Sequence, residues 1–113
     1  MIRVKDIMSM AFSYEDGMRL REEMVKVLDS DGIVEIDFEG IYVFTTMFFN
    51  ACSGHFVLTN SLDWYNEHVK MVNLNAMGKE THKHSIDNAQ KKRNDNSANL
   101  TAEITQKTIS ENT

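Results

Sequence analysis

The chain has 113 residues, of which 42% are apolar, and a formal net charge of −5. This length suits a single domain, because a chain of this size buries roughly 60–68% of its unfolded surface on folding. The single cysteine, Cys52, excludes an intrachain disulfide framework and a multi-cysteine zinc site. No apolar run reaches the roughly 20 residues of a membrane-spanning helix, and the N-terminus 1–6 is charged where a signal peptide is apolar. We therefore expect a cytoplasmic protein.

Charge is divided unevenly along the chain. Residues 1–90 carry 8 Lys or Arg against 14 Asp or Glu, whereas residues 91–113 carry 4 against 3. An acidic body argues against a duplex-DNA surface, which needs clustered positive charge. The run Lys91-Lys92-Arg93 is the only basic cluster, and a solvated helix end explains it better than a nucleic-acid contact. We expect neither a nucleic acid nor a membrane as partner.

The first half of the chain alternates strand and helix signals. Residues 2–8 begin with Ile2 and Val4 on one face and Arg3 and Lys5 on the other, an alternation that predicts a strand. Ser13 precedes acidic residues in the S-x-x-D/E pattern of a helix start, so we predict a helix of about fifteen residues that ends at the turn residues 29–32. Residues 33–38 are β-branched or aromatic at most positions, which predicts a second strand, and residues 41–44 are again apolar.

The second half continues the alternation. Thr45 or Thr46 can cap a helix whose apolar face contains Phe48, Phe49, Cys52 and Phe56, and Gly54 within it indicates close approach to a neighbouring backbone. Residues 60–63 read as a connection, residues 68–74 as a strand, and Asn75 as the cap of a last helix.

This order of elements predicts an α/β domain over residues 1–90. Its sheet is expected to be mixed but mostly parallel, with about four strands and three to four helices. Ten of the last 23 residues are Ser, Thr or Asn, so residues 91–113 are predicted to form a polar, disordered C-terminal tail.

Motifs for cofactors and metals are weak. No G-x-G-x-x-G or G-x-x-x-x-G-K-S/T is present to cradle a phosphate. His82 and His84 stand two apart on a predicted helix and point to different sides, so they are poorly placed to share one ion. His84 and Asp87 could share a face, but a solvated surface helix is the favoured interpretation. We expect no metal and no cofactor.

Candidate catalytic residues also have plainer explanations. Cys52 has His55 three residues on, yet it lies within an apolar stripe where free cysteines usually pack as small hydrophobes. Asp37 and Glu39 end a strand, where open α/β sheets place ligands, but turn formation is favoured. An enzyme that uses Asp37, Cys52 and His55 is therefore the weakest hypothesis, and we expect no enzyme.

Thr45 and Thr46 lie between the apolar residues 41–44 and an aromatic helix. A hydroxyl at a helix N-terminus can help to bind an anion such as phosphate, because the helix dipole is positive there. It can equally be the N-cap of the helix, which physical reasoning favours. Both interpretations stay open at this point.

The stretch Ile36-Asp37-Phe38-Glu39-Gly40-Ile41, followed by Thr45-Thr46-Met47-Phe48, resembles the STAS-like family. In that family a strand ending in Asp-Phe-x-Gly-Val/Ile leads into a Ser/Thr-rich turn and an aromatic helix. Ser13-x-x-x-Gly17 upstream and Val72-Asn73-Leu74 downstream also match, so the resemblance covers roughly residues 1–90.

The wider STAS superfamily includes anti-sigma-factor antagonists, whose Ser or Thr beside an Asp is phosphorylated by a GHKL-type kinase. The resemblance places Thr46 at the phosphoacceptor position and Thr45 at the preceding Asp. The Asp-Ser-Ser-Gly signature is not retained, since Met47 and Phe48 stand in its last two places.

The resemblance implies a non-enzymatic regulatory module, bacterial in origin, that binds a GHKL-type ATPase or kinase. The residues expected at the partner contact are Asp37, Glu39, Met47 and Phe48. The alternative is a small-ligand or nucleotide-binding domain that uses the helix N-terminus at Thr45-Thr46. The oligomeric state and the role of the tail do not follow from the sequence.

Overall fold

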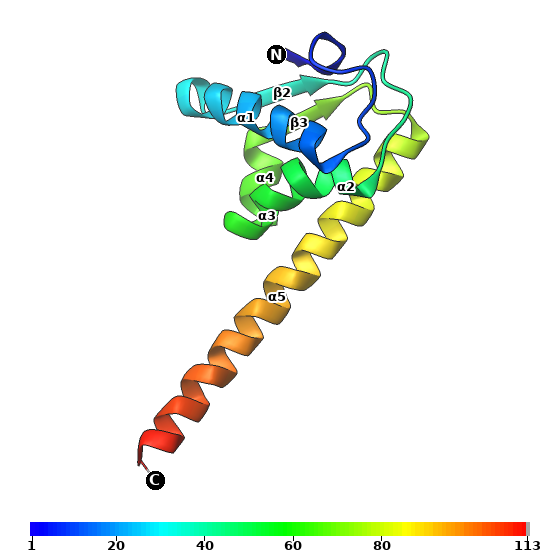
Figure 1. Ribbon diagram of the computed structural model, residues 1–113. Helices are drawn as coiled ribbons and strands as arrows, with labels where there is room; N and C mark the ends of the chain where they lie inside the picture. The colour runs from blue at the N-terminus through cyan, green and yellow to red at the C-terminus, as the bar shows by residue number, and fades with distance from the viewer. Residues whose placement is uncertain (113) are drawn as a thin grey trace.

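The computed structural model describes the backbone of residues 1–112 and the side chains of residues 1–95. In chain order its elements are β1 (Ile2–Arg3), the 3₁₀ helix η1 (Val4–Asp6), α1 (Tyr14–Asp31), β2 (Val34–Asp37), α2 (Thr46–Phe49), the π-helix η2 (Asn50–Gly54), α3 (His55–Thr59), α4 (Leu62–His68), β3 (Val69–Val72) and α5 (Ala76–Asn112) (Figure 1). The predicted α/β class is confirmed.

The sheet has three parallel strands in the described part of the chain, in the order β1-β2-β3, where about four were predicted. The strand predicted over residues 2–8 ends after Arg3. Val4 and Met8 are both buried and stand four residues apart, a spacing that suits a helical turn, and the Met8 N–H donates to the Val4 carbonyl at 3.0 Å. The segment 41–44 contributes one isolated bridge, from Phe44 to Ala11.

One face of the sheet packs on the core and the other faces solvent. On β2, Val34 and Ile36 are fully buried while Glu35 between them is exposed. Lys70, the register partner of Glu35 on β3, is exposed as well. This alternation is the pattern of a sheet that is covered on a single face.

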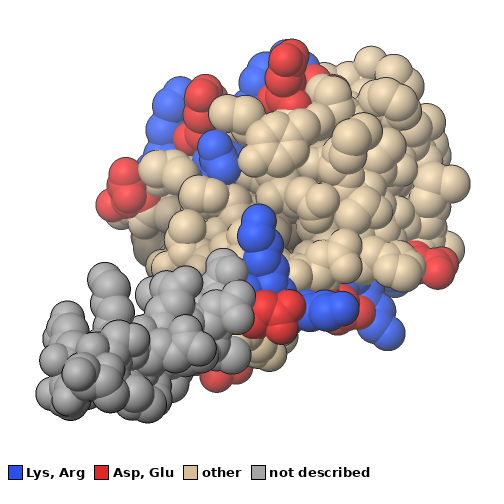
Figure 2. Space-filling model, turned by 60° about the horizontal axis from the view of Figure 1, so that its bottom comes forward, with Lys and Arg blue, Asp and Glu red and all other residues tan. Residues whose placement is uncertain are grey.

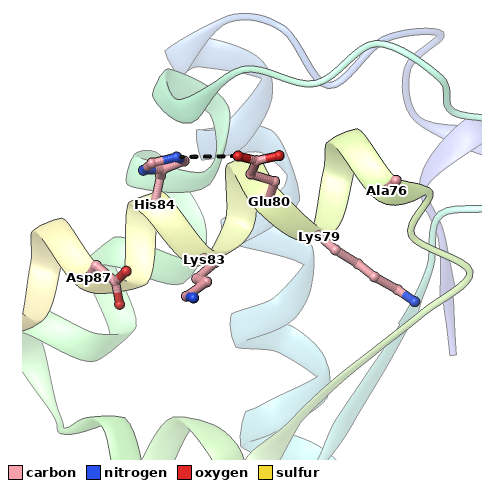
Figure 3. A pocket seen from close by; sticks show the side chains of 6 residues that line it. All are labelled: Ala76, Lys79, Glu80, Lys83, His84 and Asp87. Atoms are coloured by element: carbon pink, nitrogen blue, oxygen red, sulfur yellow. Dashed lines mark ion pairs between the residues drawn. The ribbon is translucent and has the colours of Figure 1, made fainter.

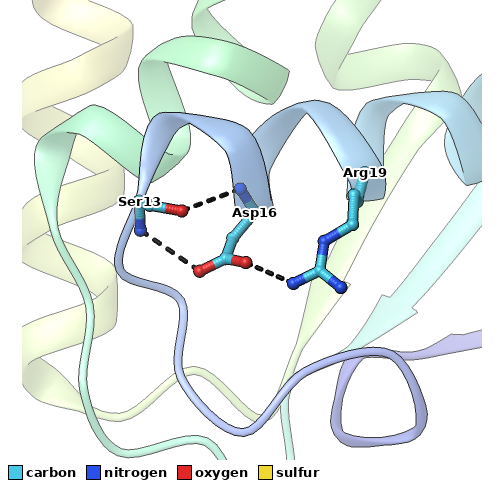
Figure 4. Close-up of polar contacts among 3 residues, drawn as sticks. All are labelled: Ser13, Asp16 and Arg19. Carbon is cyan, nitrogen blue, oxygen red and sulfur yellow. Dashed lines mark hydrogen bonds and ion pairs between the residues drawn. The ribbon is translucent and has the colours of Figure 1, made fainter.

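Helix α1 begins at the capping box that the sequence predicted. The Ser13 hydroxyl accepts from the Asp16 N–H at 3.0 Å, and the Asp16 carboxylate accepts from the Ser13 N–H at 3.3 Å (Figure 4). Arg19, one turn on, pairs with the same carboxylate, and chiefly this contact lowers the pKa of Asp16. Gly32, with φ 77°, ends the helix in the left-handed conformation that glycine adopts most easily.

The core is built around an aromatic cluster. The rings of Phe38, Phe44, Phe48 and Phe49 contact one another with centroids 5.1–6.4 Å apart. Two of these rings come from α2, which continues without a break through η2 into α3. Residues 51–54 of η2 are all buried, so the wider π turn lies inside the protein.

Helix α5 packs on η2 and α3. The Ser85 hydroxyl donates to Asn50 Oδ1 at 2.7 Å, and a Cβ on Gly54 would lie 3.3 Å from Ser85 Oγ. Gly54 thus lies close to α5, although the nearest atom belongs to a side chain and not to a backbone as predicted. Asn75 accepts from the Gly78 N–H at 2.7 Å, as predicted for its cap. Arg93 donates to the Leu58 carbonyl at 2.8 Å, so one residue of the basic run holds the end of α3.

The backbone of α5 is helical as far as Asn112, whereas the sequence predicted an irregular tail from residue 91. The segment 91–112 contains neither Pro nor Gly, so nothing in it interrupts a helix that is already nucleated. Whether residues 91–113 act separately from the domain stays a prediction.

Candidate functional site

Three segments of the chain contain no Lys, Arg, Asp or Glu: residues 7–14, 40–62 and 71–78. The bridge between Ala11 and Phe44 joins the first to the second, because the Ala11 N–H donates to the Val43 carbonyl and the Thr45 N–H to the Ala11 carbonyl, both at 3.0 Å. The third begins within β3, and its Asn75 side chain donates to the Tyr42 carbonyl at 3.5 Å. Segments far apart in sequence thus form one uncharged part of the molecule.

The side chains beside this bridge point outward. Ala11 and Phe44 are buried, so their neighbours along the chain face solvent. Several large apolar side chains are exposed in these segments, with Tyr42 at 74% and Met47 at 52%. Those of Met10, Phe12, Tyr42, Val43 and Met47 are called the apolar patch below. Figure 2 shows a broad, nearly uncharged face on the side where Figure 1 places α2 and the loop before it. Grouped apolar side chains of this kind mark interaction surfaces.

Thr45, not Thr46, caps α2. The Thr45 hydroxyl accepts from the Phe48 N–H at 3.2 Å and donates to the Phe12 carbonyl, which ties the two loops together. Its only proton is therefore engaged within the protein. Thr46 is the first residue of α2, partly exposed, and adjoins Met47 of the apolar patch. Its roles as phosphoacceptor or anion ligand stay predictions.

We expect the two threonines to differ in their effect on stability. Thr45→Ala removes the cap and the tie to Phe12, and should lower the free energy of unfolding by about 1–2 kcal/mol. Thr46→Ala removes no capping bond and should change it by less than about 0.5 kcal/mol. Urea unfolding of both variants measures the difference; equal losses would contradict the assignment of the cap.

Asp37 has the turn role that the sequence analysis favoured. It is 7% exposed, and its carboxylate accepts from the Glu39 N–H and from the Asn73 side chain, both at 2.9 Å. The hydrogen bond from Asn73, followed by that from Glu39, lowers the pKa of Asp37. Both hydrogen bonds reach Oδ1, and the carboxylate thus joins the ends of β2 and β3.

The other predicted contact residues divide by exposure. Glu39 and Met47 are exposed. Phe48 is fully buried in the aromatic cluster, so its inclusion in the contact set is wrong. The reason is helix phase: neighbouring residues of a helix lie about 100° apart, so Met47 faces out while Phe48 faces the core.

The residues of the enzyme hypothesis are not assembled. Cys52 is fully buried, its thiol donates to the Phe48 carbonyl at 3.5 Å, and burial raises its pKa to about 12. His55 packs on Phe56, and burial, followed by the charge of Arg21, lowers its pKa. Among the described side chains, no hydrogen bond or ion pair joins any two of Asp37, Cys52 and His55.

A buried polar chain was missed by the sequence analysis. The Tyr65 hydroxyl donates to Ser53 Oγ at 2.8 Å and lies 2.7 Å from His82 Nε2, while the His82 ring packs edge-on against Phe49. The placement of His82 on a solvated helix face is therefore wrong. The signal was present: His82, Ile86 and Ala89 follow the i, i+4, i+7 spacing of one buried helix face.

A hollow of about 570 Å³ lies along α5, lined by Ala76, Lys79, Glu80, Lys83, His84 and Asp87 (Figure 3). All of these come from one helix, so nothing encloses a ligand. His84 pairs with Glu80 at 3.9 Å and points away from Asp87 in Figure 3, so these two residues do not form a pair of metal ligands. Within residues 1–95, no three His, Cys, Asp or Glu side chains are grouped to hold a metal.

Comparison with known proteins places the chain in a family. No helix among the described residues is long and apolar enough to cross a bilayer. Neither a curated protein nor a solved structure matches the chain. The profile of the STAS-like domain of unknown function (DUF4325) matches residues 16–79, which include most of α1, the sheet strands β2 and β3, and residues 41–47. Because the match covers more than half of the 113 residues, the chain belongs to this STAS-like family.

Proposed function

We propose that this STAS-like domain is a non-enzymatic interaction module of a bacterial regulatory switch. In this proposal the apolar patch binds a protein partner, a GHKL-type ATPase or kinase. The observation that carries the proposal is the group of exposed apolar side chains in the two bridged loops and at the start of α2. Thr46 lies at this helix start, at the position that the resemblance to anti-sigma-factor antagonists assigns to the phosphoacceptor.

The chemistry of the patch favours a protein over a small ligand. Its side chains are exposed, large and uncharged, as the central anchors of protein interfaces are. The Thr45 hydroxyl, one half of the alternative anion site, already donates its proton to the Phe12 carbonyl. Glu39, exposed at the start of the same loop, would then lie at the polar rim of the contact.

Phosphorylation of Thr46 would act as the switch. A phosphate adds about −1.5 to −2 charges, which the positive end of α2 tolerates locally. The same charge beside an apolar patch must lose its hydration when a partner covers that patch. Modification would therefore release the partner while the domain stays folded.

The contact surface is tested by introducing the same negative charge at two positions, one inside the apolar patch and one outside it. Met47→Glu places a carboxylate in the apolar patch, near a helix start that accommodates it. Val25→Glu, the matched control, places the same charge on exposed α1 outside the patch. We expect Met47→Glu to reduce capture of a GHKL-type protein from an extract of the source cells at least tenfold, and Val25→Glu to retain it. Equal capture by both variants, measured by mass spectrometry, would contradict the assignment of the partner contact to the apolar patch.

The switch needs a second pair of variants. Thr46→Glu imitates the phosphate charge and Thr46→Gln matches its size without charge. In calorimetric titration we expect Thr46→Glu to bind the purified partner at least tenfold more weakly than the wild type. The affinity of Thr46→Gln should be close to that of the wild type. A Thr46→Glu domain that binds as tightly as wild type would rule the switch out.

The small-ligand alternative makes a different prediction. A nucleotide bound at Thr45-Thr46 must raise the melting temperature through linkage, by an amount that grows with its concentration. A rise with ATP or GTP that Thr46→Ala abolishes, together with no captured protein, would favour that alternative over the proposal.

A further inference from the structure

Strand β3 is an edge of the sheet, with β2 on one side and no strand on the other among the described residues (Figure 1). The Phe38 N–H donates to the Val72 carbonyl at 3.0 Å, so Val72 directs its backbone groups toward β2. Neighbouring residues of a strand direct theirs to opposite sides. Met71 therefore points its N–H and C=O away from β2, toward the open side.

A groove of about 460 Å³ lies along this open edge. It is lined by the edge strand itself and by two helices that extend past it, with Tyr65 and Asn66 from α4, Met71 and Leu74 at β3, and Lys79 and His82 from α5. The groove thus lies where a fourth strand of the sheet would run, above a floor supplied by the helical layer.

The lining indicates what kind of chain would fit. The lining combines apolar and polar groups. Met71 and Leu74 are partly exposed, the buried Tyr65 turns its hydroxyl inward to Ser53, and Asn66, Asn73, Lys79 and His82 are polar. Lys79 is the only Lys, Arg, Asp or Glu in the lining, and no ion pair joins it to a carboxylate within the described side chains. A ligand that complements this lining offers backbone hydrogen bonds, an apolar side chain and a carboxylate.

We propose that this groove binds an extended, acidic segment of a partner protein as a fourth strand beside β3. Main-chain hydrogen bonds to Met71 supply affinity. An apolar side chain of the segment packs over the partly exposed Met71 and Leu74, and an acidic one pairs with Lys79. The site differs from the apolar patch and does not depend on the function proposed for it.

The experiment starts from a displayed library of random heptapeptides selected on the purified full chain. Selected peptides are expected to alternate polar and apolar residues and to carry Asp or Glu, and to slow amide hydrogen exchange at Met71 in the wild-type protein. Lys79→Glu should weaken the binding of a selected peptide at least tenfold. Lys83→Glu, one turn further along α5 and outside the groove, should not.

A second pair isolates the backbone contact. Met71→Pro and Met71→Ala both remove the side chain, but only proline removes the outward N–H, which β2 does not use. We expect Met71→Ala to bind more than tenfold tighter than Met71→Pro. If Met71→Pro does not fold, the proposal is tested by amide exchange at Met71 and by the comparison of Lys79→Glu with Lys83→Glu.

Three outcomes would overturn the proposal. The first is exchange protection at residues 10–12 and 42–47 in place of Met71. The second is peptides that bind as helices or without an acidic residue. The third is protection of the Met71 amide from exchange in the absence of peptide, if this protection increases with protein concentration. That result would assign the edge to a second copy of the chain.

Discussion

Gly17→Ala is expected to lower the free energy of unfolding by about 3 kcal/mol or more, although glycine-to-alanine changes inside helices usually stabilise by about 0.5–1 kcal/mol. A Cβ at this position would lie 2.2 Å from the carbonyl oxygen of Phe48 and 2.7 Å from the Cβ of Ala51. Because the nearer atom is backbone, no side-chain rotation relieves the overlap. Helix α1 would have to move away from α2 and η2, and the aromatic cluster would lose its close packing.

Gly54→Ala is the matched control, since Gly54 is also buried and helical. Its Cβ would lie 3.3 Å from Ser85 Oγ, and a side-chain atom can shift where a carbonyl cannot. We expect a loss of about 1 kcal/mol or less for Gly54→Ala in urea unfolding. A Gly17→Ala protein as stable as wild type would show that α1 does not approach α2 and η2 as described.

The second large effect is a loss of stability in mild acid, through His82. Burial lowers the pKa of His82 to about 4, whereas a histidine in the unfolded chain titrates near 6.5. Below pH 6.5 the unfolded chain therefore binds a proton that the folded domain does not, and the free energy of unfolding falls as the pH approaches 4. At 1.36 kcal/mol per pKa unit this amounts to roughly 3 kcal/mol.

His82→Gln tests the assignment, because the glutamine amide can donate to the Tyr65 hydroxyl oxygen but does not titrate. Urea unfolding at pH 7.5, 5.5 and 4.5 should show a shallower pH dependence for His82→Gln than for wild type. The remaining slope belongs partly to His55, whose pKa burial also lowers. A pH dependence in His82→Gln as steep as that of the wild type would contradict the assignment.

Local signals in the sequence predicted local structure well. The capping box at Ser13, the cap at Asn75 and the turn at Asp37 each depend on residues within four positions of one another, and the structure confirms all three. The strands of the sheet were harder to predict, because a strand needs a neighbouring strand to pair with as well as an alternating pattern. The alternation of apolar and charged residues that begins at Ile2 ends at Lys5, and the chain turns after Arg3 into a helical turn that the Met8 N–H closes on the Val4 carbonyl.

The candidate site could be predicted only in part, because its surface depends on tertiary contacts. Thr46, Met47 and Phe48 were singled out from the sequence. Phe48 is the next residue along the helix after Met47, about 100° further around its axis, and its side chain faces the core. Met10 and Phe12 join the apolar patch only through the bridge at Ala11, which links residues about thirty positions apart. The absence of charge from residues 40–62 was visible in the sequence and is the signal that would have outlined the surface.

The π-helix η2 matters for any alignment of this chain with its relatives. A π turn contains one more residue than an α turn, and one residue rotates everything after it by about 100°. A relative with a regular helix at this place should have one residue fewer between Phe48 and Phe56, and the alignment gap belongs within Asn50–Gly54. A gap placed before α2 would shift the position that corresponds to Thr46 by one, and would compare the wrong hydroxyl across the family.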